Sequence, residues 1–165
     1  MKLEIERKFR VRSDGWRGLS TRTIRIRQGY IAHGPHLVVR VRLTDQDARL
    51  TVKTGASGVT RQELEFEMAH AEAAFLIDHH AEGQVIEKTR HLVPVAGLVW
   101  EIDVFEGANQ GLVIAEVELE AEEQPFEHPF WLGIEVTGDP RFYNSALARH
   151  PFRNWPGHGG LGVLE

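Results

Sequence analysis

The segment LEIERKFRV, residues 3–11, alternates apolar and charged side chains with a period of two. Its odd-numbered positions are apolar except for Arg7, and its even-numbered positions include Glu4, Glu6 and Lys8. Such alternation is typical of a β-strand and not of a helix, whose apolar positions recur every three or four residues. The segment therefore predicts a strand with one apolar face and one charged face.

Seven further segments alternate in the same way between turn-forming residues. They are residues 24–31, 36–43, 49–54, 59–68, 85–93, 98–105 and 112–121. Residues 53–58 predict a hairpin turn, because they lack the G-x-x-x-x-G-K order and the following helix of a phosphate-binding loop.

Three other segments predict helical structure. Residues 69–82 are rich in Ala, Glu and His and contain neither Pro nor Gly, which favours a helix. Residues 127–133 predict a short helical turn. Asn144 and Ser145 predict the capped start of a helix that continues through residues 146–149.

The composition describes one globular domain of 165 residues, with 42% hydrophobic and 26% charged residues. The chain has no cysteine, which excludes a disulfide framework and a thiolate zinc site and favours a reducing compartment, the cytoplasm. A charged N-terminus predicts no secretory signal, and no apolar run approaches the roughly 20 residues of a membrane span. We expect one domain over residues 1–150, an irregular tail over residues 151–165 and no membrane partner.

The formal net charge is −5, from 19 Lys and Arg residues against 24 Asp and Glu residues. This mild acidity excludes the extended basic surface by which proteins bind nucleic acid.

The polar faces of the predicted strands carry mostly ionisable side chains. They are Glu4, Glu6 and Lys8; Arg40 and Arg42; Lys53; Arg61, Glu63 and Glu65; Lys88 and Arg90; Glu101 and Asp103; and Glu116, Glu118 and Glu120. One such face alone is typical of a solvated sheet surface. Seven such charged faces on successive strands favour a closed barrel, with the charged faces inward and the apolar faces outward. We predict an α+β, mainly β fold: an eight-stranded antiparallel closed barrel, or tunnel, with a few flanking helices, and with Trp100 and Trp131 packed on its outer face.

Charges inside such a tunnel must be paired or must bind a ligand, since an unpaired buried charge is costly. Clustered Lys and Arg side chains suit phosphate oxygens, and clustered carboxylates suit a hard divalent cation. A polyphosphate with Mg²⁺ or Mn²⁺ satisfies both groups, whereas a fatty-acid carrier would need an apolar interior.

Several motifs together resemble those of the CYTH superfamily of triphosphate tunnel metalloenzymes. They are Glu4-Ile5-Glu6-Arg7-Lys8, Gln28-Gly29-Tyr30, Arg40-Val41-Arg42, Thr51-Val52-Lys53, Arg61-Gln62-Glu63-Leu64-Glu65, Ile86-Glu87-Lys88-Thr89-Arg90, Glu101-Ile102-Asp103 and Glu116-Val117-Glu118. The resemblance spans about residues 1–150 and is closest to the short bacterial branch. It implies a tunnel that binds a linear triphosphate and hydrolyses it with a divalent metal.

The resemblance also implies roles for individual side chains. The implied main metal ligands are Glu4, Glu6, Glu116 and Glu118, and the implied ligands of a second ion or of metal-bound water are Glu63, Glu65 and Asp103. The implied phosphate-binding residues are Lys8, Arg40, Arg42, Lys53, Arg61, Lys88 and Arg90.

Tyr30 is our candidate for orienting or deprotonating the attacking water, with Lys53 beside it as a second catalytic residue. A neighbouring ammonium group would lower the tyrosine pKa from about 10. The alternative is that Tyr30 is a packed or lid residue.

The sequence departs from the family pattern at Tyr143, where family members often carry a lysine before the Asn of the C-terminal helix. The change bears on the length of phosphate chain accommodated or on the closing of one tunnel mouth. Arg141 is the residue that would compensate.

The first function predicted is hydrolysis of inorganic triphosphate or of the triphosphate of a small organic ester, such as thiamine triphosphate or a nucleoside triphosphate. One alternative is adenylate cyclase activity, which needs a site for adenine and ribose that is not evident. Another is a non-catalytic polyphosphate or nucleotide sensor, which would gain nothing from the complete carboxylate set. A homodimer would cover outward apolar surface that two helices leave exposed.

Overall fold

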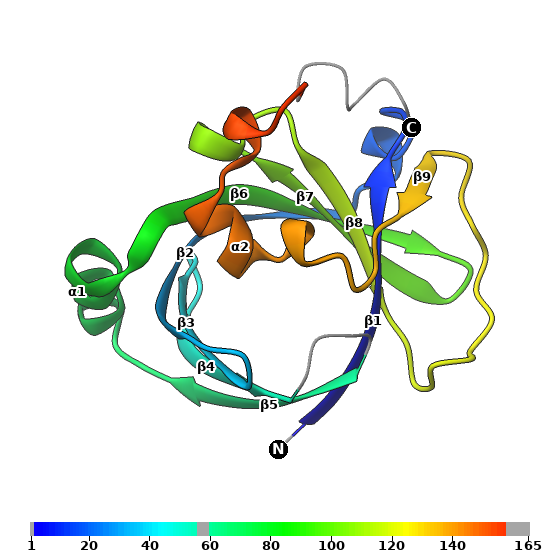
Figure 1. Cartoon of the computed structure of the whole chain (residues 1–165). Coiled ribbons are helices and arrows are strands. Elements are labelled where there is room, and N and C mark those ends of the chain that lie inside the picture. The colour runs from blue at the N-terminus through cyan, green and yellow to red at the C-terminus, as the bar shows by residue number, and fades with distance from the viewer. Residues whose placement is uncertain (1, 56–59, 158–165) are drawn as a thin grey trace.

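The strands form one antiparallel sheet that closes on itself around a central space (Figure 1). The computed structural model describes residues 2–55 and 60–157, so the middle of the predicted hairpin turn and the end of the predicted tail lie outside the described residues. The strands are β1 (Lys2–Val11), β2 (Arg22–His33), β3 (Leu37–Leu43), β4 (Ala48–Thr54), β5 (Thr60–Glu67), β6 (Glu82–Val95), β7 (Leu98–Phe105), β8 (Val113–Glu118) and β9 (Leu132–Glu135). The helices are α1 (His70–His80) and α2 (Asn144–Arg149), with short 3-10 turns at Arg17–Leu19, Gly107–Asn109, Pro140–Phe142 and Phe152–Asn154.

Strand β1 closes the barrel because one of its edges pairs with β8 and the other pairs with β5. The strand order is β5-β4-β3-β2-β6-β7-β8-β1-β9, with a further β5–β1 pairing. Glu4 of β1 lies opposite Arg61 of β5, whereas Lys8 lies opposite Glu116 of β8. This confirms the predicted eight-stranded closed barrel, to which β9 adds one short outer strand.

The predicted helical turn at residues 127–133 is wrong. Residues 132–135 instead form β9, in which Glu135 pairs with Phe9 and Leu132 pairs with Val11. β5 pairs with β1 only as far as Ile5. Further along, β9 pairs with the edge of β1 opposite β8 and satisfies its backbone groups, while Trp131 and Leu132 become buried.

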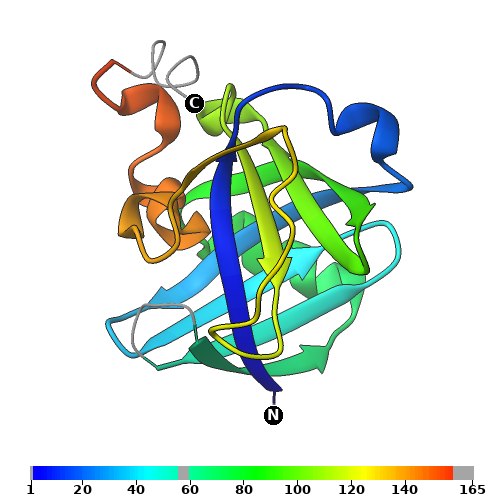
Figure 2. The same cartoon turned by 90° about the vertical axis from the view of Figure 1, so that its right-hand side faces the viewer.

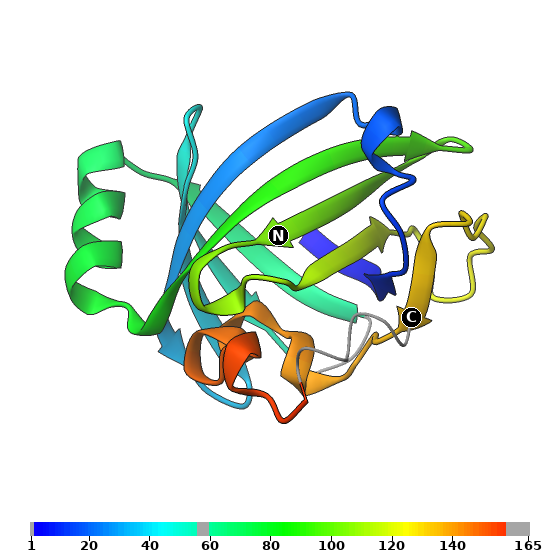
Figure 3. The same ribbon diagram turned by 90° about the horizontal axis from the view of Figure 1, so that it is seen from above.

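The apolar faces of the strands point outward and are covered by other parts of the chain. On one side, Trp100 and Trp131 pack edge to face with ring centroids 5.6 Å apart, as predicted for the outer face. Figure 2 shows the segment between β8 and β9 crossing the outside of the barrel here, and Phe126 of that segment packs against Trp100. On another side, α1 covers β2, β3 and β4 through Ala73 and Ile77 (Figure 3).

One end of the barrel interior is apolar. Ile86, Phe105 and Ile114 lie there, and they pack with Leu147 of α2 and with Phe152. Figures 1 and 3 show α2 and the C-terminal segment at this end of the barrel. The helix therefore closes part of one mouth with an apolar plug.

Within the described residues, no helix is both long and apolar enough to cross a membrane.

Gly83 lets α2 approach β6 closely, and this predicts a steep stability cost for a side chain there. Its φ is +69°, and an added Cβ would lie 2.4 Å from the Ala148 carbonyl oxygen. Gly97 has a similar φ of +83° but no atom within 4 Å of its Cβ position. We expect Gly97→Ala to lower the free energy of unfolding by about 1–2 kcal/mol, and Gly83→Ala by about 2 kcal/mol more. Urea unfolding followed by circular dichroism measures both, and equal losses would contradict the close contact.

Candidate active site

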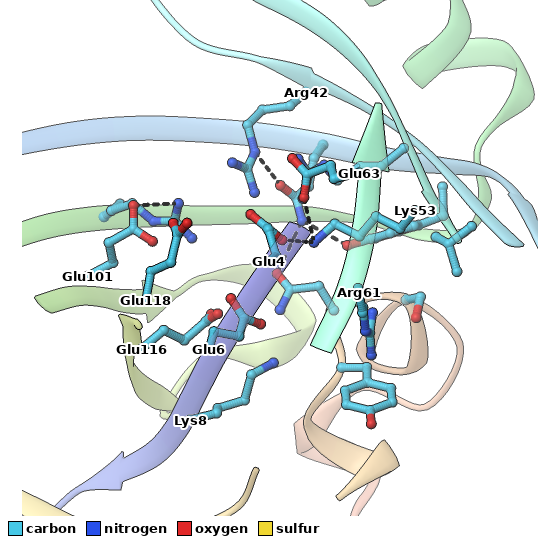
Figure 4. A pocket seen from close by; sticks show the side chains of 18 of the residues that line it. Glu4, Glu6, Lys8, Arg42, Lys53, Arg61, Glu63, Glu101, Glu116 and Glu118 are labelled. Atoms are coloured by element: carbon cyan, nitrogen blue, oxygen red, sulfur yellow. Dashed lines mark hydrogen bonds and ion pairs between the residues drawn. The ribbon is translucent and has the colours of Figure 1, made fainter. Parts of the chain in front are cut away.

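A cavity of about 250 Å³ lies inside the barrel and is lined by equal numbers of acidic and basic side chains. The seven acids are Glu4, Glu6, Glu63, Glu65, Glu101, Glu116 and Glu118, and the seven bases are Lys8, Arg40, Arg42, Lys53, Arg61, Lys88 and Arg90. Figure 4 shows Glu4, Glu6 and Lys8 projecting from β1 toward Glu63, Lys53 and Glu116. The structure thus brings together every predicted site residue except Asp103.

The two charge types occupy different arcs of the barrel wall. Strands β4, β3, β2 and β6 are consecutive neighbours that contribute no acidic side chain to the lining. β4, β3 and β6 contribute basic side chains, and β2 contributes Gln28 and Tyr30. Strands β7, β8, β1 and β5 complete the circle and contribute every carboxylate, with Lys8 and Arg61 as the basic exceptions. A ligand inside the barrel therefore meets a cationic arc on one side and an acidic arc on the other.

The cavity continues into a hollow at each end. One hollow, of about 350 Å³, shares Val38, Arg61 and Tyr143 with the cavity and lies beside α2. The other, of about 480 Å³, shares Arg42 and Glu101 with it. The cavity and the two hollows therefore form a tunnel through the barrel.

Asp103 is buried behind the lining and does not border the cavity. Its carboxylate accepts hydrogen bonds from Lys88 Nζ at 2.7 Å and from Arg90 Nε and Nη2 at 2.8 and 2.9 Å. Burial acts to raise the pKa of Asp103, but Arg90 and Lys88 together hold it well below its usual value. Asp103 thus holds in place two of the cations that the sequence predicts to bind phosphate.

Glu6 and Glu116 form a close carboxylate pair in the acidic arc. Burial, reinforced by the charge of Glu116, raises the pKa of Glu6 to about 8. Burial opposes ionisation of Glu116 as well, but Lys8 and other neighbours lower its pKa to about 2. At neutral pH the pair therefore retains one proton where a cation would relieve the repulsion.

Glu63 forms a second carboxylate group with Glu4 and Glu65. Burial and hydrogen bonding to Glu4 and Glu65 raise the pKa of Glu63 to about 8. Its Oε2 has no hydrogen-bond partner among the described residues, and Lys53 Nζ lies 3.7 Å from it. Lys53 Nζ is also 3.7 Å from Glu4 Oε2, so this lysine stands between the two arcs.

The cationic arc is strongly desolvated. Burial lowers the pKa of Lys88 to about 7 against the opposing effect of Asp103. Burial, with Arg40 and Arg90, lowers the pKa of Arg42 to about 9. Arg40 Nη2 donates to Thr51 Oγ1 at 3.2 Å, whereas its buried Nε has no hydrogen-bond partner among the described residues. An anion in the cavity would stabilise all three cations.

The predicted lowering of the Tyr30 pKa is wrong. Burial raises it, and the opposing effects of Arg40, Arg42 and Lys8 do not overcome the loss of hydration. Lys53 forms its ion pairs with Glu4 and Glu63 instead. Tyr30 lines the cavity as a neutral phenol that also packs against the apolar plug.

Arg141 does not replace the family lysine at the cavity. It is exposed, and its Nη2 lies 2.7 Å from Asp139 Oδ2. Tyr143 itself lines the cavity, with Arg61 Cζ 4.7 Å and Lys8 Nζ 5.5 Å from the centre of its ring. The aromatic ring thus stacks with two cations that a lysine would repel.

Sequence reasoning assigned no site role to four polar residues of the lining. They are Gln28, Glu101, Asn144 and Ser145. Period-two alternation places Gln28 on the same face as Tyr30, and Glu101 on the same face as Asp103. The alternation alone could therefore have identified both as lining residues. Asn144 was predicted as a helix cap, but Tyr143 occupies the cap position, and Asn144 Oδ1 accepts from Gln28 and Lys88. Its amide turns to the cavity instead.

Three comparisons relate the chain to known proteins. The CYTH domain family model matches residues 2–143. The inorganic triphosphatase of Acetivibrio thermocellus is 43% identical over 152 residues, covering 92% of this chain and 97% of that protein. The inorganic triphosphatase of Nitrosomonas europaea is 37% identical over 152 residues, covering 88% of this chain and 96% of that protein. A solved crystal structure of an inorganic triphosphatase aligns with a TM-score of 0.64 at 34% identity, covering 93% of this chain and 100% of that one.

The burial of Asp103 predicts that its main effect is on stability. We expect Asp103→Asn to lower the free energy of unfolding by about 3–5 kcal/mol, because Lys88 and Arg90 lose a buried counter-charge. Asp78→Asn is the control, since Asp78 pairs with Arg27 on the exposed surface and should cost at most about 1 kcal/mol. Chemical denaturation measures both. An Asp103→Asn protein of unchanged stability would contradict this role.

Proposed function

The chain belongs to the CYTH domain family, and on this basis we propose that it is an inorganic triphosphatase that hydrolyses linear tripolyphosphate with a divalent metal ion. The observation that carries the proposal is the division of the tunnel wall into a cationic and an acidic arc. A non-catalytic anion sensor has no need of seven carboxylates facing its ligand. A triphosphate with its metal ion is complementary to both arcs.

The cationic arc binds the phosphate chain. Its N–H donors belong to Arg40, Arg42, Lys53, Lys88 and Arg90. Two further cationic side chains, Lys8 and Arg61, donate from the other arc near α2. Phosphoryl transfer needs little covalent help from the protein and depends on positioning and on stabilising charge at the phosphate oxygens. These fixed donors perform that task in a site shielded from bulk water.

The acidic arc fits a divalent cation in its chemistry. Carboxylate oxygens suit Mg²⁺ and Mn²⁺, and the raised pKa values of Glu6 and Glu63 show carboxylates that a cation would stabilise in the ionised form. Among residues 2–55 and 60–157, no three His, Cys, Asp or Glu side chains are already arranged as a metal site.

The residues that would hold the ion are Glu4, Glu6, Glu116 and Glu118, with Glu63 and Glu65 beside them. When bound, the ion neutralises phosphate charge and makes its water more acidic. Mg²⁺ or Mn²⁺ as the ion, a homodimer and a cytoplasmic location stay predictions from the sequence.

One observation favours a second substrate class. The hollow beside α2 has an apolar wall that includes Leu37, Val38 and Ala146, and it joins the tunnel at Arg61 and Tyr143. An organic group carried on a triphosphate would fit there, which makes thiamine triphosphate and ATP informative competitors.

The proposed function is tested by offering tripolyphosphate, thiamine triphosphate and ATP separately with Mg²⁺ or Mn²⁺ and identifying the products by ion chromatography. We expect orthophosphate and pyrophosphate from tripolyphosphate, and no turnover after chelation of the metal with EDTA. Cyclic AMP with pyrophosphate from ATP would establish a cyclase. Tight binding of tripolyphosphate without any product would establish a sensor.

The metal role of the acidic arc predicts a specific defect in Glu6→Gln. We expect the Mn²⁺ concentration for half-maximal activity to rise about tenfold or more, because a charged ligand becomes a neutral one. Glu120→Gln is the control, since Glu120 is exposed and does not line the cavity. Metal titrations of activity and of Mn²⁺ binding by electron paramagnetic resonance measure the change. Unchanged metal dependence of Glu6→Gln would remove Glu6 from the ligand set.

Tyr30 is proposed to contact the reacting phosphate or water, and this predicts a loss of turnover more than of affinity. Tyr30→Phe keeps the ring in the apolar plug and removes only the hydroxyl. We expect kcat to fall about 100-fold, as for the loss of one transition-state hydrogen bond, with KM changed by no more than about threefold. Steady-state kinetics with tripolyphosphate measure both constants, and a wild-type kcat would exclude Tyr30 from the mechanism.

A further inference from the structure

Gln28 links three residues of the tunnel wall through its buried amide. It is fully buried, and its Oε1 accepts a hydrogen bond from Arg42 Nε at 2.8 Å. Its Nε2 donates to the Tyr30 hydroxyl oxygen and to Asn144 Oδ1, each at 3.1 Å. Both ends of the amide are therefore used, and one side chain connects β3, β2 and α2.

The direction of these hydrogen bonds follows from the chemistry of the partners. Arg42 can only donate, so the oxygen of the Gln28 amide must face it and the nitrogen must face Tyr30. An amide nitrogen does not accept, so the Tyr30 oxygen is the acceptor. The hydroxyl hydrogen of the neutral Tyr30 is then left to be donated to another group.

The amide oxygen of Asn144 accepts a hydrogen bond from Lys88 in the same way. Lys88 Nζ donates to Asn144 Oδ1 at 2.8 Å and to Asp103 Oδ2 at 2.7 Å. An ammonium group has three N–H bonds, so one of them is left for a ligand in the cavity. Arg42 likewise gives its Nε–H to Gln28 and keeps its two NH₂ groups for a ligand.

The position of Asn144 depends on the C-terminal helix. Asn144 is the first residue of α2, which packs against β6 and contributes Leu147 to the apolar plug. The Gln28–Asn144 hydrogen bond thus joins a segment from the end of the chain to the phosphate-binding strands.

We propose that Gln28 and Asn144 are positioning residues that act through Arg42, Lys88 and Tyr30. The oxygens of Gln28 and Asn144 accept the Arg42 and Lys88 hydrogens that do not face the substrate, and the Gln28 nitrogen donates to the Tyr30 oxygen. Each of the three groups then presents its remaining hydrogens to the phosphates. The proposal rests on the proposed triphosphatase activity. It gives the C-terminal helix a part in the chemistry as well as in closing the barrel.

The expected effect is on the transition state more than on substrate binding. The charges of Arg42 and Lys88 remain when their partners are removed, so ground-state attraction for the phosphates changes little. A misplacement of about 1 Å at a reacting centre can cost about 100-fold in rate. Loss of either amide should therefore lower kcat while sparing KM.

The test compares steady-state kcat and KM for tripolyphosphate with saturating metal in a set of variants. Asn144→Leu and Gln28→Met remove the amides at nearly constant size, and we expect each to lower kcat about 10- to 100-fold with KM within about threefold of wild type. The double variant should lose no more than about threefold beyond the worse single variant, because the two residues act as one unit. Asn144→Asp keeps an acceptor for Lys88 and Gln28, so it should keep a kcat within about tenfold of wild type and raise KM through repulsion of the anionic substrate.

Asn109→Leu is the matched control. Asn109 is also buried, and its Oδ1 accepts a hydrogen bond from Phe152 N at 2.8 Å, away from the cavity. We expect this variant to melt at a lower temperature with the kcat of wild type. Melting temperatures of all variants verify folding, and Asn144→Ala replaces Asn144→Leu in the set if leucine prevents it.

Three outcomes would overturn the proposal while the wild-type chain is active. They are a wild-type kcat in Asn144→Leu, fully multiplicative losses in the double variant, and an Asn144→Asp protein as impaired in kcat as Asn144→Leu. A wild-type chain that turns over no triphosphate would overturn the proposed function itself, and this proposal with it. The two failures are therefore distinguishable.

Discussion

The structure depends on one electrostatic constraint, the enclosure of seven carboxylates and seven cationic groups within a single barrel. Charges removed from water must be neutralised by partners, and here the partners are only partly supplied by the wall itself. Asp103 pairs with both Lys88 and Arg90, whereas Arg40 Nε and Glu63 Oε2 have no hydrogen-bond partner among the described residues. The same constraint reverses the strand faces relative to those of a lipid carrier, whose interior is apolar. Here the apolar faces point outward, and α1 and the segment before β9 cover them.

The charged lining ends where Ile86 and Ile114 replace charged residues on the inner faces of β6 and β8. This change of polarity gives α2 an apolar surface on which to pack inside the mouth of the barrel. Packing of α2 in turn brings Tyr143 and Asn144 to the lining, although they follow the last barrel strand by more than twenty residues. The plug and the active site are therefore consecutive parts of one inner surface.

Much of this arrangement was predictable from the sequence, because period-two alternation assigns side chains to faces and a closed barrel turns the charged faces inward. The alternation does not reveal which charges pair across strands. Asp103 and Glu101 share a face and both pair with Arg90, but the register places Asp103 opposite Arg90 and Glu101 opposite Glu116. Asp103 is therefore enclosed between Lys88 and Arg90, whereas Glu101 lines the cavity. The conformation of residues 132–135 and the orientation of Asn144 escaped prediction because tertiary contacts decide both.

The direction of the hydrogen bonds around Gln28 gives the two arcs different chemical roles: one presents hydrogen-bond donors and the other presents acceptors. Arg42 and Lys88 already donate to Gln28 and Asn144, and the Tyr30 oxygen already accepts from Gln28. Their remaining hydrogens are available to the cavity, and such a surface is complementary to phosphate oxygens. The cationic arc offers no carboxylate to an attacking water molecule. Proton acceptors are instead concentrated in the opposite arc, where the carboxylates of β7, β8, β1 and β5 lie. Donors and acceptors thus face each other across the substrate. A net charge of −5 conceals this division, because it averages two arcs of opposite character into one modest excess of acid.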